Sequence, residues 1–146
     1  MRCVWVALLL WATACTEARS PPRGLRVPLP EGWVAIPAGS GMLQVGPKGR
    51  VVLTLERRPG ALLSLNALRG AVESEGASIT QANGSASSTS VRYSKPGAPE
   101  AMLTVRALEP GVLLLCASTG QTEPSELDAA QTVCGGVRLE AVAATR

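Results

Sequence analysis

The sequence predicts an α+β fold in which two helices pack against a largely antiparallel sheet. Short apolar runs separated by turns rich in Gly and Pro predict the strands, and apolar residues at helical spacing in two other segments predict the helices. Because strands and helices are grouped along the chain, we expect the helices to lie against the sheet. A chain of 146 residues that is 46% hydrophobic can bury one core of this kind.

Two hairpins account for much of the expected sheet. Glu109-Pro110-Gly111 joins one pair of strands, and Asn83-Gly84 joins another, although the Ser- and Thr-rich residues 85–90 could instead form a loop. The apolar run from Val112 to Leu115 predicts the centre of the sheet. The expected strands comprise residues 33–36, 42–45, 51–57, 78–82, 89–93, 101–108 and 112–118, with 137–139 as a last short strand.

The segment after the turn Pro47-Lys48-Gly49 alternates in the way that is typical of a strand with one buried face. The alternation predicts that Val51, Leu53 and Leu55 share that face. The residues between them are expected on the opposite side of the sheet.

The first helix is expected over residues 64–75. Ser64 is a suitable N-cap, Leu65, Leu68 and Val72 fall on one face, and Gly76 is a suitable stop. The spacing predicts a helix of about three turns whose apolar face packs on the sheet.

The second helix is expected to begin at Ser125-Glu126-Leu127-Asp128, which resembles a capping box. Leu127, Ala130, Val133 and Cys134 then share one face. This spacing predicts that Cys134 faces the sheet.

Residues 1–14 have the organisation of a secretory signal peptide. Arg2 supplies a positive start, residues 4–12 are an unbroken apolar run, and Ala12-Thr13-Ala14 offers small residues for cleavage. This run is too short to cross a membrane as a helix, which needs about 20 apolar residues. We therefore exclude the segment from the fold.

Ala12-Thr13-Ala14-Cys15 resembles the lipobox of bacterial lipoproteins, whose cysteine is diacylated and becomes the mature N-terminus. Ala12 stands where that family prefers Leu. The resemblance implies that Cys15 carries a lipid anchor. Residues 16–24 are polar, contain two prolines and show no periodicity, so residues 15–26 are expected to be a lipidated N-terminus and flexible tether. Ordinary cleavage after Ala14, without acylation, is the alternative. Thr16 is not the aspartate that retains many lipoproteins in the inner membrane, so the outer membrane is the expected destination.

The number of cysteines bears on whether Cys15 is acylated. Loss of the signal peptide removes Cys3 and leaves Cys15, Cys116 and Cys134. If Cys15 is acylated, Cys116 on the central strand and Cys134 on the inner helix face form a natural pair. Export supplies the oxidising compartment, so a strand-to-helix disulfide is predicted. The absence of a C-x-x-C motif and of histidine disfavours a metal or redox pair.

A family resemblance covers the mature domain from Val27 to about Leu139. Leu29-Pro30-Glu31-Gly32-Trp33 is similar to the LP-x-GW start that is common in PsbP/Mog1-like domains. A late strand cysteine followed by a helix cysteine is also similar to small bacterial lipoproteins of that fold. The resemblance implies an accessory, assembly or binding role, and it implies no catalytic residues.

The composition argues against catalysis, metal binding and nucleic-acid binding. The chain has no histidine, the commonest general base and metal ligand, and Asp128 is its only aspartate. Arg57-Arg58 is the only basic doublet of the domain, too sparse for a nucleic-acid surface. No cofactor is expected. Trp33, Arg57 and Arg58 are candidate partner-binding residues, with a core position for Trp33 and a solubilising role for the arginines as alternatives.

These features together predict a non-catalytic lipoprotein of the bacterial cell envelope, attached to the membrane through its lipid. Residues 27–146 are expected to form a single domain that acts as an accessory or assembly protein and binds another envelope protein. The alternative is a carrier or sensor of a small apolar ligand. A hydrolase with no recognisable motif is the third hypothesis.

Overall fold

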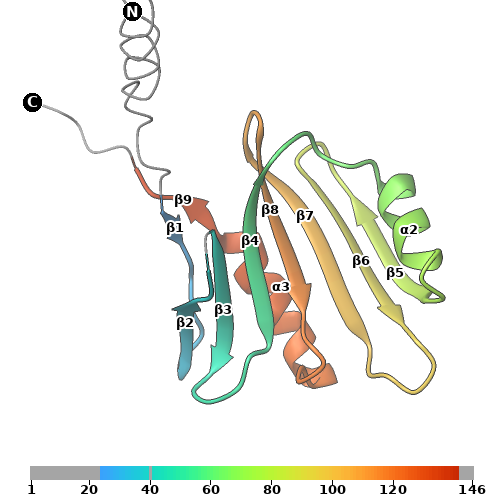
Figure 1. The fold of residues 1–146 in the computed structure, drawn as a ribbon, viewed down its shortest axis with the longest axis horizontal. Helices are drawn as coiled ribbons and strands as arrows, with labels where there is room; N and C mark the ends of the chain where they lie inside the picture. The colour runs from blue at the N-terminus through green and yellow to red at the C-terminus, as the bar shows by residue number, and fades with distance from the viewer. Residues whose placement is uncertain (1–23, 40, 142–146) are drawn as a thin grey trace, which may run out of the picture. The chain divides into compact units, whose positions relative to one another are not determined.

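The computed structural model describes residues 24–39 and 41–141 (Figure 1). Within this part, an antiparallel sheet has the strand order β2-β3-β4-β8-β7-β6-β5, and β1 pairs separately with β9. The strands are β1 Leu25–Arg26, β2 Trp33–Pro37, β3 Met42–Pro47, β4 Leu53–Pro59, β5 Ser78–Gly84, β6 Ser88–Ser94, β7 Ala101–Glu109, β8 Val112–Ser118 and β9 Arg138–Leu139. The helices are α2 Leu65–Glu73, the 3₁₀ turn η1 Pro124–Glu126 and α3 Leu127–Gly136.

The predicted fold class is confirmed. Two helices pack on an antiparallel sheet, and a disulfide joins Cys116 on β8 to Cys134 on α3 with Cα atoms 6.1 Å apart. The run Val112–Leu115 lies on β8, which is the central strand of the sheet, as its composition predicted. Residues 25–139 form one compact unit. The signal peptide, Cys15 and most of the expected tether lie outside the described residues.

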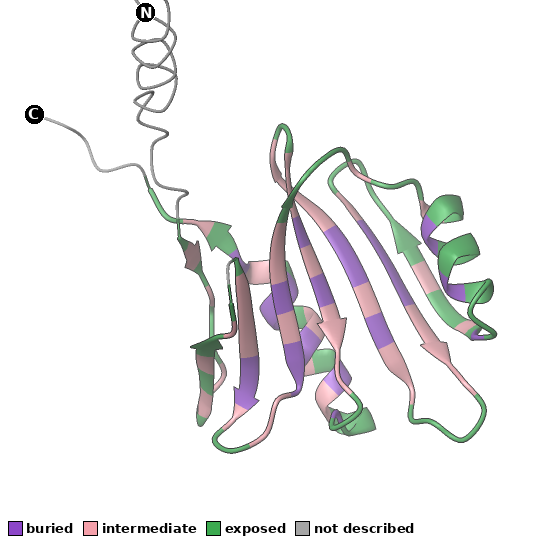
Figure 2. Ribbon diagram, viewed as in Figure 1, coloured by how far each residue is buried: buried purple, intermediate pink, exposed green. Residues whose placement is uncertain are grey.

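The two helices cover opposite faces of the sheet. Leu114 and Cys116 point from β8 into a core with the buried side of α3, which includes Leu127 and Cys134. Leu113 and Leu115 on β8 point to the opposite face, into a smaller core beneath α2. This division follows from strand geometry, because successive side chains point to opposite faces. Figure 2 shows the alternation as buried and partly buried bands along β4, β8 and β7.

Arginines from the sheet hold α3 at several points. Arg92 on β6 donates a hydrogen bond to Asp128 at 2.5 Å, in the first turn of the helix. Arg106 on β7 donates to the carbonyls of Cys134 and of Val137, the latter at 3.1 Å, at the end of the helix. A cation there satisfies carbonyl groups that the helix itself leaves without partners.

The first helix forms as predicted. Ser64 caps it by accepting a hydrogen bond from the Ala67 amide at 3.1 Å. Leu68 and Val72 are buried, and Leu65 packs against the same core.

The second helix starts differently from the prediction, although its buried face is the predicted one. The capping box predicted over residues 125–128 is wrong: Glu126 instead accepts a hydrogen bond from the Glu123 amide at 3.1 Å. Pro124 causes the difference, because it favours the first position of a helical turn and so starts the short turn η1 before α3.

The predicted turn at Asn83-Gly84 is also wrong, although the hairpin itself is present. Gly84 pairs with Thr89, and the chain reverses after it, where the Ser85 amide donates to the Ser88 carbonyl at 2.8 Å. Gly84 does not have the positive φ that a two-residue turn of this type requires. The alternative of a loop over residues 85–90 fails for its second half, because β6 begins at Ser88.

The alternation predicted for residues 51–57 holds only from Leu53 onward. Leu53 and Leu55 are fully buried, but Val52 is buried as well, whereas Val51 is partly exposed. The reason is that β4 begins at Leu53; before it the chain is irregular, and the Val52 amide donates to the Val45 carbonyl at 2.9 Å. Strand alternation does not apply to such a segment.

Removing the disulfide should lower the free energy of unfolding by about 3 kcal/mol. The bond closes a loop with a sequence separation of 18 residues, and the chain-entropy relation gives this magnitude for such a loop. We expect the variant Cys116→Ala/Cys134→Ala to unfold at lower urea concentration than the oxidised protein. The reduced wild-type protein is the control for lost packing, and equal stability of all three forms would contradict the prediction.

Candidate functional site

The sheet face opposite α3 is covered by a helix over only part of its width. α2 packs against β5 and β6 at one end of this face (Figure 1). The rest of the face carries side chains that are exposed or partly exposed, and we refer to it as the open face. Its residues are Val34, Ile36, Gln44, Thr54, Glu56, Arg58, Leu113, Leu115 and Ala117.

The open face has a polar column on β4, with apolar side chains on β8 to one side of it and on β2 beyond β3 on the other. Glu56 on β4 lies opposite Leu115 on β8, and Arg58 lies opposite Leu113, so polar and apolar columns run next to each other. On β2, Ile36 is 54% exposed, and Val34 on the same face is exposed as well. β8 is apolar on both of its faces, because Leu114 and Cys116 lie on the α3 face and Leu113 and Leu115 on the open face. α3 covers only the first of these faces.

The polar column carries a neutralised charge pair. The Arg58 Nε atom lies 2.9 Å from a Glu56 carboxylate oxygen. The hydrogen bond from Arg58 lowers the pKa of Glu56, and the same bond raises the pKa of Arg58. A surface that docks here meets a closed ion pair at the border of an apolar column, and not a net charge.

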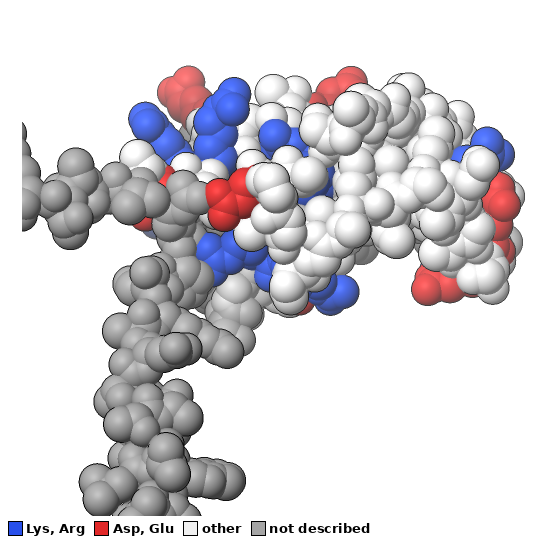
Figure 3. All heavy atoms as spheres, turned by 90° about the horizontal axis from the view of Figure 1, so that it is seen from above, with Lys and Arg blue, Asp and Glu red and all other residues white. Residues whose placement is uncertain are grey.

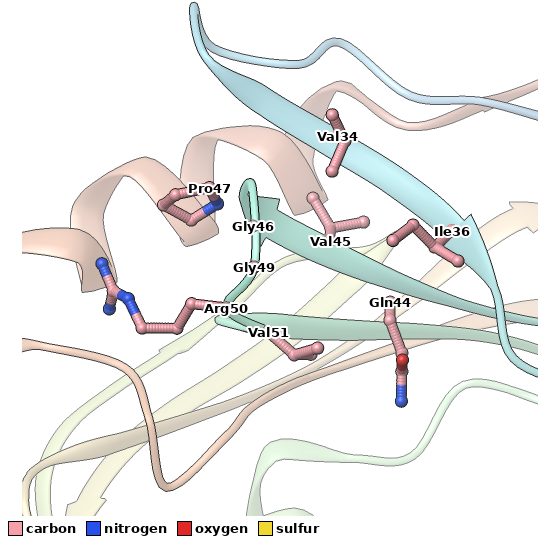
Figure 4. Close-up of a pocket in the computed structure, with 9 residues that line it drawn as sticks. All are labelled: Val34, Ile36, Gln44, Val45, Gly46, Pro47, Gly49, Arg50 and Val51. Carbon is pink, nitrogen blue, oxygen red and sulfur yellow. The ribbon is translucent and has the colours of Figure 1, made fainter.

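A small hollow of about 80 Å³ lies at the β2 end of the open face (Figure 4). Val34, Ile36 and Gln44 line one side of it, and Val51 lines another. Gly46, at its wall, lets the backbone of residues 50–52 pass close to β3, because a Cβ atom there would lie 2.3 Å from the Arg50 carbonyl oxygen. The lining is almost entirely apolar, which suits an aliphatic side chain better than a polar ligand.

Arg50 contributes backbone and aliphatic atoms to this hollow, but its charge is directed elsewhere. Its guanidinium donates to Glu126 at 2.8 Å and to the Gln121 carbonyl at 2.9 Å. Figure 4 shows the side chain directed away from Gln44. The hydrogen bond from Arg50 lowers the pKa of Glu126, which keeps this carboxylate ionised at the start of α3.

A second hollow, of about 330 Å³, lies at the loop ends of β6, β7 and β8. Tyr93 and Lys95 form part of its wall, and the Lys95 ammonium binds Glu75 at 3.0 Å. The hydroxyl groups of Ser118 and Thr119 are engaged with backbone atoms of Met102 and Val51. Lys95, Ser118 and Thr119 thus already have structural partners.

The three candidate partner-binding residues do not form one patch. Trp33 begins β2 and packs against the core on the α3 face. Arg57 also lies on that face, because it alternates with Arg58 along β4. Of the three, only Arg58 lies on the open face.

Sequence reasoning missed most of the open face. Ile36 and Gln44 gave no separate signal. The residue pattern of such a strand is the same whether its outer face meets solvent or a partner protein. Leu113 and Leu115 did give one: β8 is apolar at successive positions, which requires cover on both faces.

The described residues contain few groups that could carry catalysis. The chain has no histidine. Among residues 24–39 and 41–141, no three Cys, Asp or Glu side chains lie close enough together to hold a metal ion. Neither helix in this part of the chain has the length and hydropathy needed to span a membrane. The geometry of the open face is suited to binding through shape and apolar contact.

Comparisons with known proteins give limited information. No protein-family model matches the sequence, and no curated protein matches it. Among solved structures, the chain is similar to the solution structure of cyanobacterial PsbP (CyanoP) from Synechocystis sp. PCC 6803, with 11% sequence identity and a TM-score of 0.46. The match covers 86% of this chain and 98% of that chain. The similarity is loose, so the resemblance to PsbP/Mog1-like domains stays a prediction.

The Arg50–Glu126 pair should make stability depend on pH in the acid range. Because the folded protein lowers the pKa of Glu126, the pair stabilises the fold above the unfolded pKa of about 4.3. This contribution is lost as the pH falls through the folded pKa. We expect Glu126→Gln to be less stable than wild type at pH 7 and to approach it in acid, as measured by urea unfolding.

Glu73→Gln is the matched control for this measurement. Glu73 and Arg69 pair at 3.7 Å on an exposed surface, where ion pairs contribute little. A pH-independent difference between Glu126→Gln and wild type would contradict the prediction.

Proposed function

We propose that this protein is a non-catalytic, lipid-anchored accessory protein of the cell envelope that binds another envelope protein through the open face. The observation that carries the proposal is the apolar column of β8, with Leu113 and Leu115, on a sheet face that α2 covers only in part. Leu113 and Leu115 are partly exposed there, and Val34 and Ile36 on β2 are exposed. Apolar side chains that remain in contact with water on one face are typical of interaction sites.

The chemistry of the open face indicates what the partner surface is like. Val34 is 39% exposed and Ile36 is 54% exposed, next to a hollow that suits an aliphatic side chain. The Glu56–Arg58 pair is neutral overall. The partner surface is therefore an apolar patch with a protruding aliphatic residue, and not a strongly charged segment.

Two features support location in the envelope. Residues 12–15 resemble a lipobox, and this resemblance implies an acylated Cys15 at the mature N-terminus. The Cys116–Cys134 disulfide suits a protein that folds in an oxidising compartment. An accessory protein held near the membrane meets its envelope partner at high local concentration.

The alternative function, as a carrier of a small apolar ligand, has weaker support. The hollow of about 330 Å³ lies at loop ends and includes Lys95 and Gly120 in its wall. An apolar ligand is better held in an enclosed apolar cavity than in such a place. The open face is the better candidate for binding.

Acylation of Cys15 should decide where the protein is found. We expect Cys15→Ala to move the exported protein from the membrane fraction to the soluble fraction after cell fractionation, because stable anchoring needs the acyl chains. Cys3→Ala is the matched control, since Cys3 leaves with the signal peptide, and it should stay membrane-bound. Full retention of Cys15→Ala in the membrane would refute the lipid anchor.

The partner should be captured from the open face and not from the helices. We expect a photo-crosslinking residue at Leu113 to give a defined adduct with one envelope protein, identified by mass spectrometry. The same residue at Asn66, on the exposed side of α2, is the control and should not give that adduct.

A charge on the open face provides the second arm of this experiment. Ile36→Asp should abolish the Leu113 adduct while the thermal midpoint stays close to that of wild type, because Ile36 is 54% exposed. An adduct that forms equally from Asn66, or that survives Ile36→Asp, would contradict docking on the open face.

A further inference from the structure

Two exposed arginines face each other on the ribbon formed by β1 and β9. Arg26 pairs with Arg138 in the antiparallel register, and both side chains are exposed. Neither has an ion-pair partner among residues 24–39 and 41–141. Like charges directly opposite in such a pair destabilise it, so the arrangement favours an anion that binds both.

Further positive charge lies next to this ribbon. Arg106 is half-buried at the end of α3, and both burial and the charge of Arg138 lower its pKa. Arg57 lies in the same row of the sheet as Arg106, with Leu114 between them. Figure 3 shows that most of the Lys and Arg side chains visible from above gather toward the β1 and β9 end. Basic side chains thus gather around the ribbon, and we refer to them as the basic surface; Glu140, whose amide donates to the Gly24 carbonyl at 2.8 Å, is its acidic neighbour.

The chain length places this basic surface near the expected anchor. Leu25, where β1 begins, follows Cys15 by ten residues (25 − 15). Ten residues span at most about 35 Å when fully extended. β1 is the element nearest to Cys15 along the chain, and its last residue is Arg26.

We infer that Arg26 and Arg138 bind the phosphate groups of anionic phospholipids at the surface of the membrane. This inference rests on the proposed membrane location and adds a contact between the folded domain and the lipid. Arg is suited to this role, because its planar guanidinium binds phosphate in a bidentate manner. Two such contacts on one ribbon limit the rotation of the domain about its tether and so set the direction in which the open face points.

The test measures binding of the exported chain that carries Cys15→Ala, so that no acyl chain contributes. Vesicles contain either phosphatidylglycerol mixed with phosphatidylcholine or phosphatidylcholine alone, and bound protein is measured by co-sedimentation at low salt. Each arginine near an anionic surface strengthens partitioning by about fivefold. We expect Arg26→Gln/Arg138→Gln to bind the anionic vesicles about 25-fold less than its parent.

Two matched variants separate a specific contact from net charge. Lys48→Gln/Arg69→Gln removes the same charge from the β3–β4 turn and from α2, and it should keep most of the binding. Arg26→Lys/Arg138→Lys keeps the charge and loses the bidentate geometry, so it should bind less than its parent and more than the Gln double variant. Thermal unfolding of Arg26→Gln/Arg138→Gln should show no loss of stability, because the substitution removes a repulsive pair.

Several outcomes would overturn the inference. Equal loss in both Gln double variants would show a general charge effect, and equal binding to neutral vesicles would exclude recognition of anionic lipid. If the protein instead bound inorganic phosphate and showed no salt-dependent binding to the anionic vesicles, the arginines would be a site for a free anion. Because the assay uses a chain without lipid and without partner, its failure would leave the anchor and the open face standing.

Discussion

The packing of α3 against the centre of the sheet is the contact on which the rest of the structure depends. Cys134 on α3 and Cys116 on β8 are fully buried and joined by the disulfide, inside the larger of the two cores. Arg92 and Arg106 hold the helix where it begins and where it ends. Because β8 is the central strand, α3 held there covers the middle of one face of the sheet, and the side chains of that face form this core.

This packing determines what the opposite face can do. β8 carries apolar side chains on both faces. On the second face Leu113 and Leu115 reach the edge of the small core beneath α2 and stay partly exposed, because α2 packs mainly on β5 and β6. Each square ångström of apolar surface left in water costs about 25 cal/mol. Covering Leu113, Leu115 and Ile36 would release this free energy, which favours docking on the open face. The Glu56–Arg58 pair on β4 lies between these apolar side chains.

Most of the fold could be predicted from the sequence because its signals are local. The caps and spacing around Ser64 and the hairpin that turns at Gly111 depend on neighbouring residues, and both form as expected. The failures are local signals that a competing constraint overrode. The register of β5 with β6 moved the turn past Gly84, and Pro124 started a helical turn before the predicted cap.

The sequence by itself determined the fold class, the disulfide and the central strand, because apolar periodicity and cysteine number constrain these directly. Only the tertiary structure decided which charges are used internally and which remain available. Strand alternation put Arg57 and Arg58 on opposite faces, and the β1–β9 pairing brought Arg26 opposite Arg138 from the two ends of the folded chain. Such placements depend on long-range register, and register is set by the whole core rather than by any short segment.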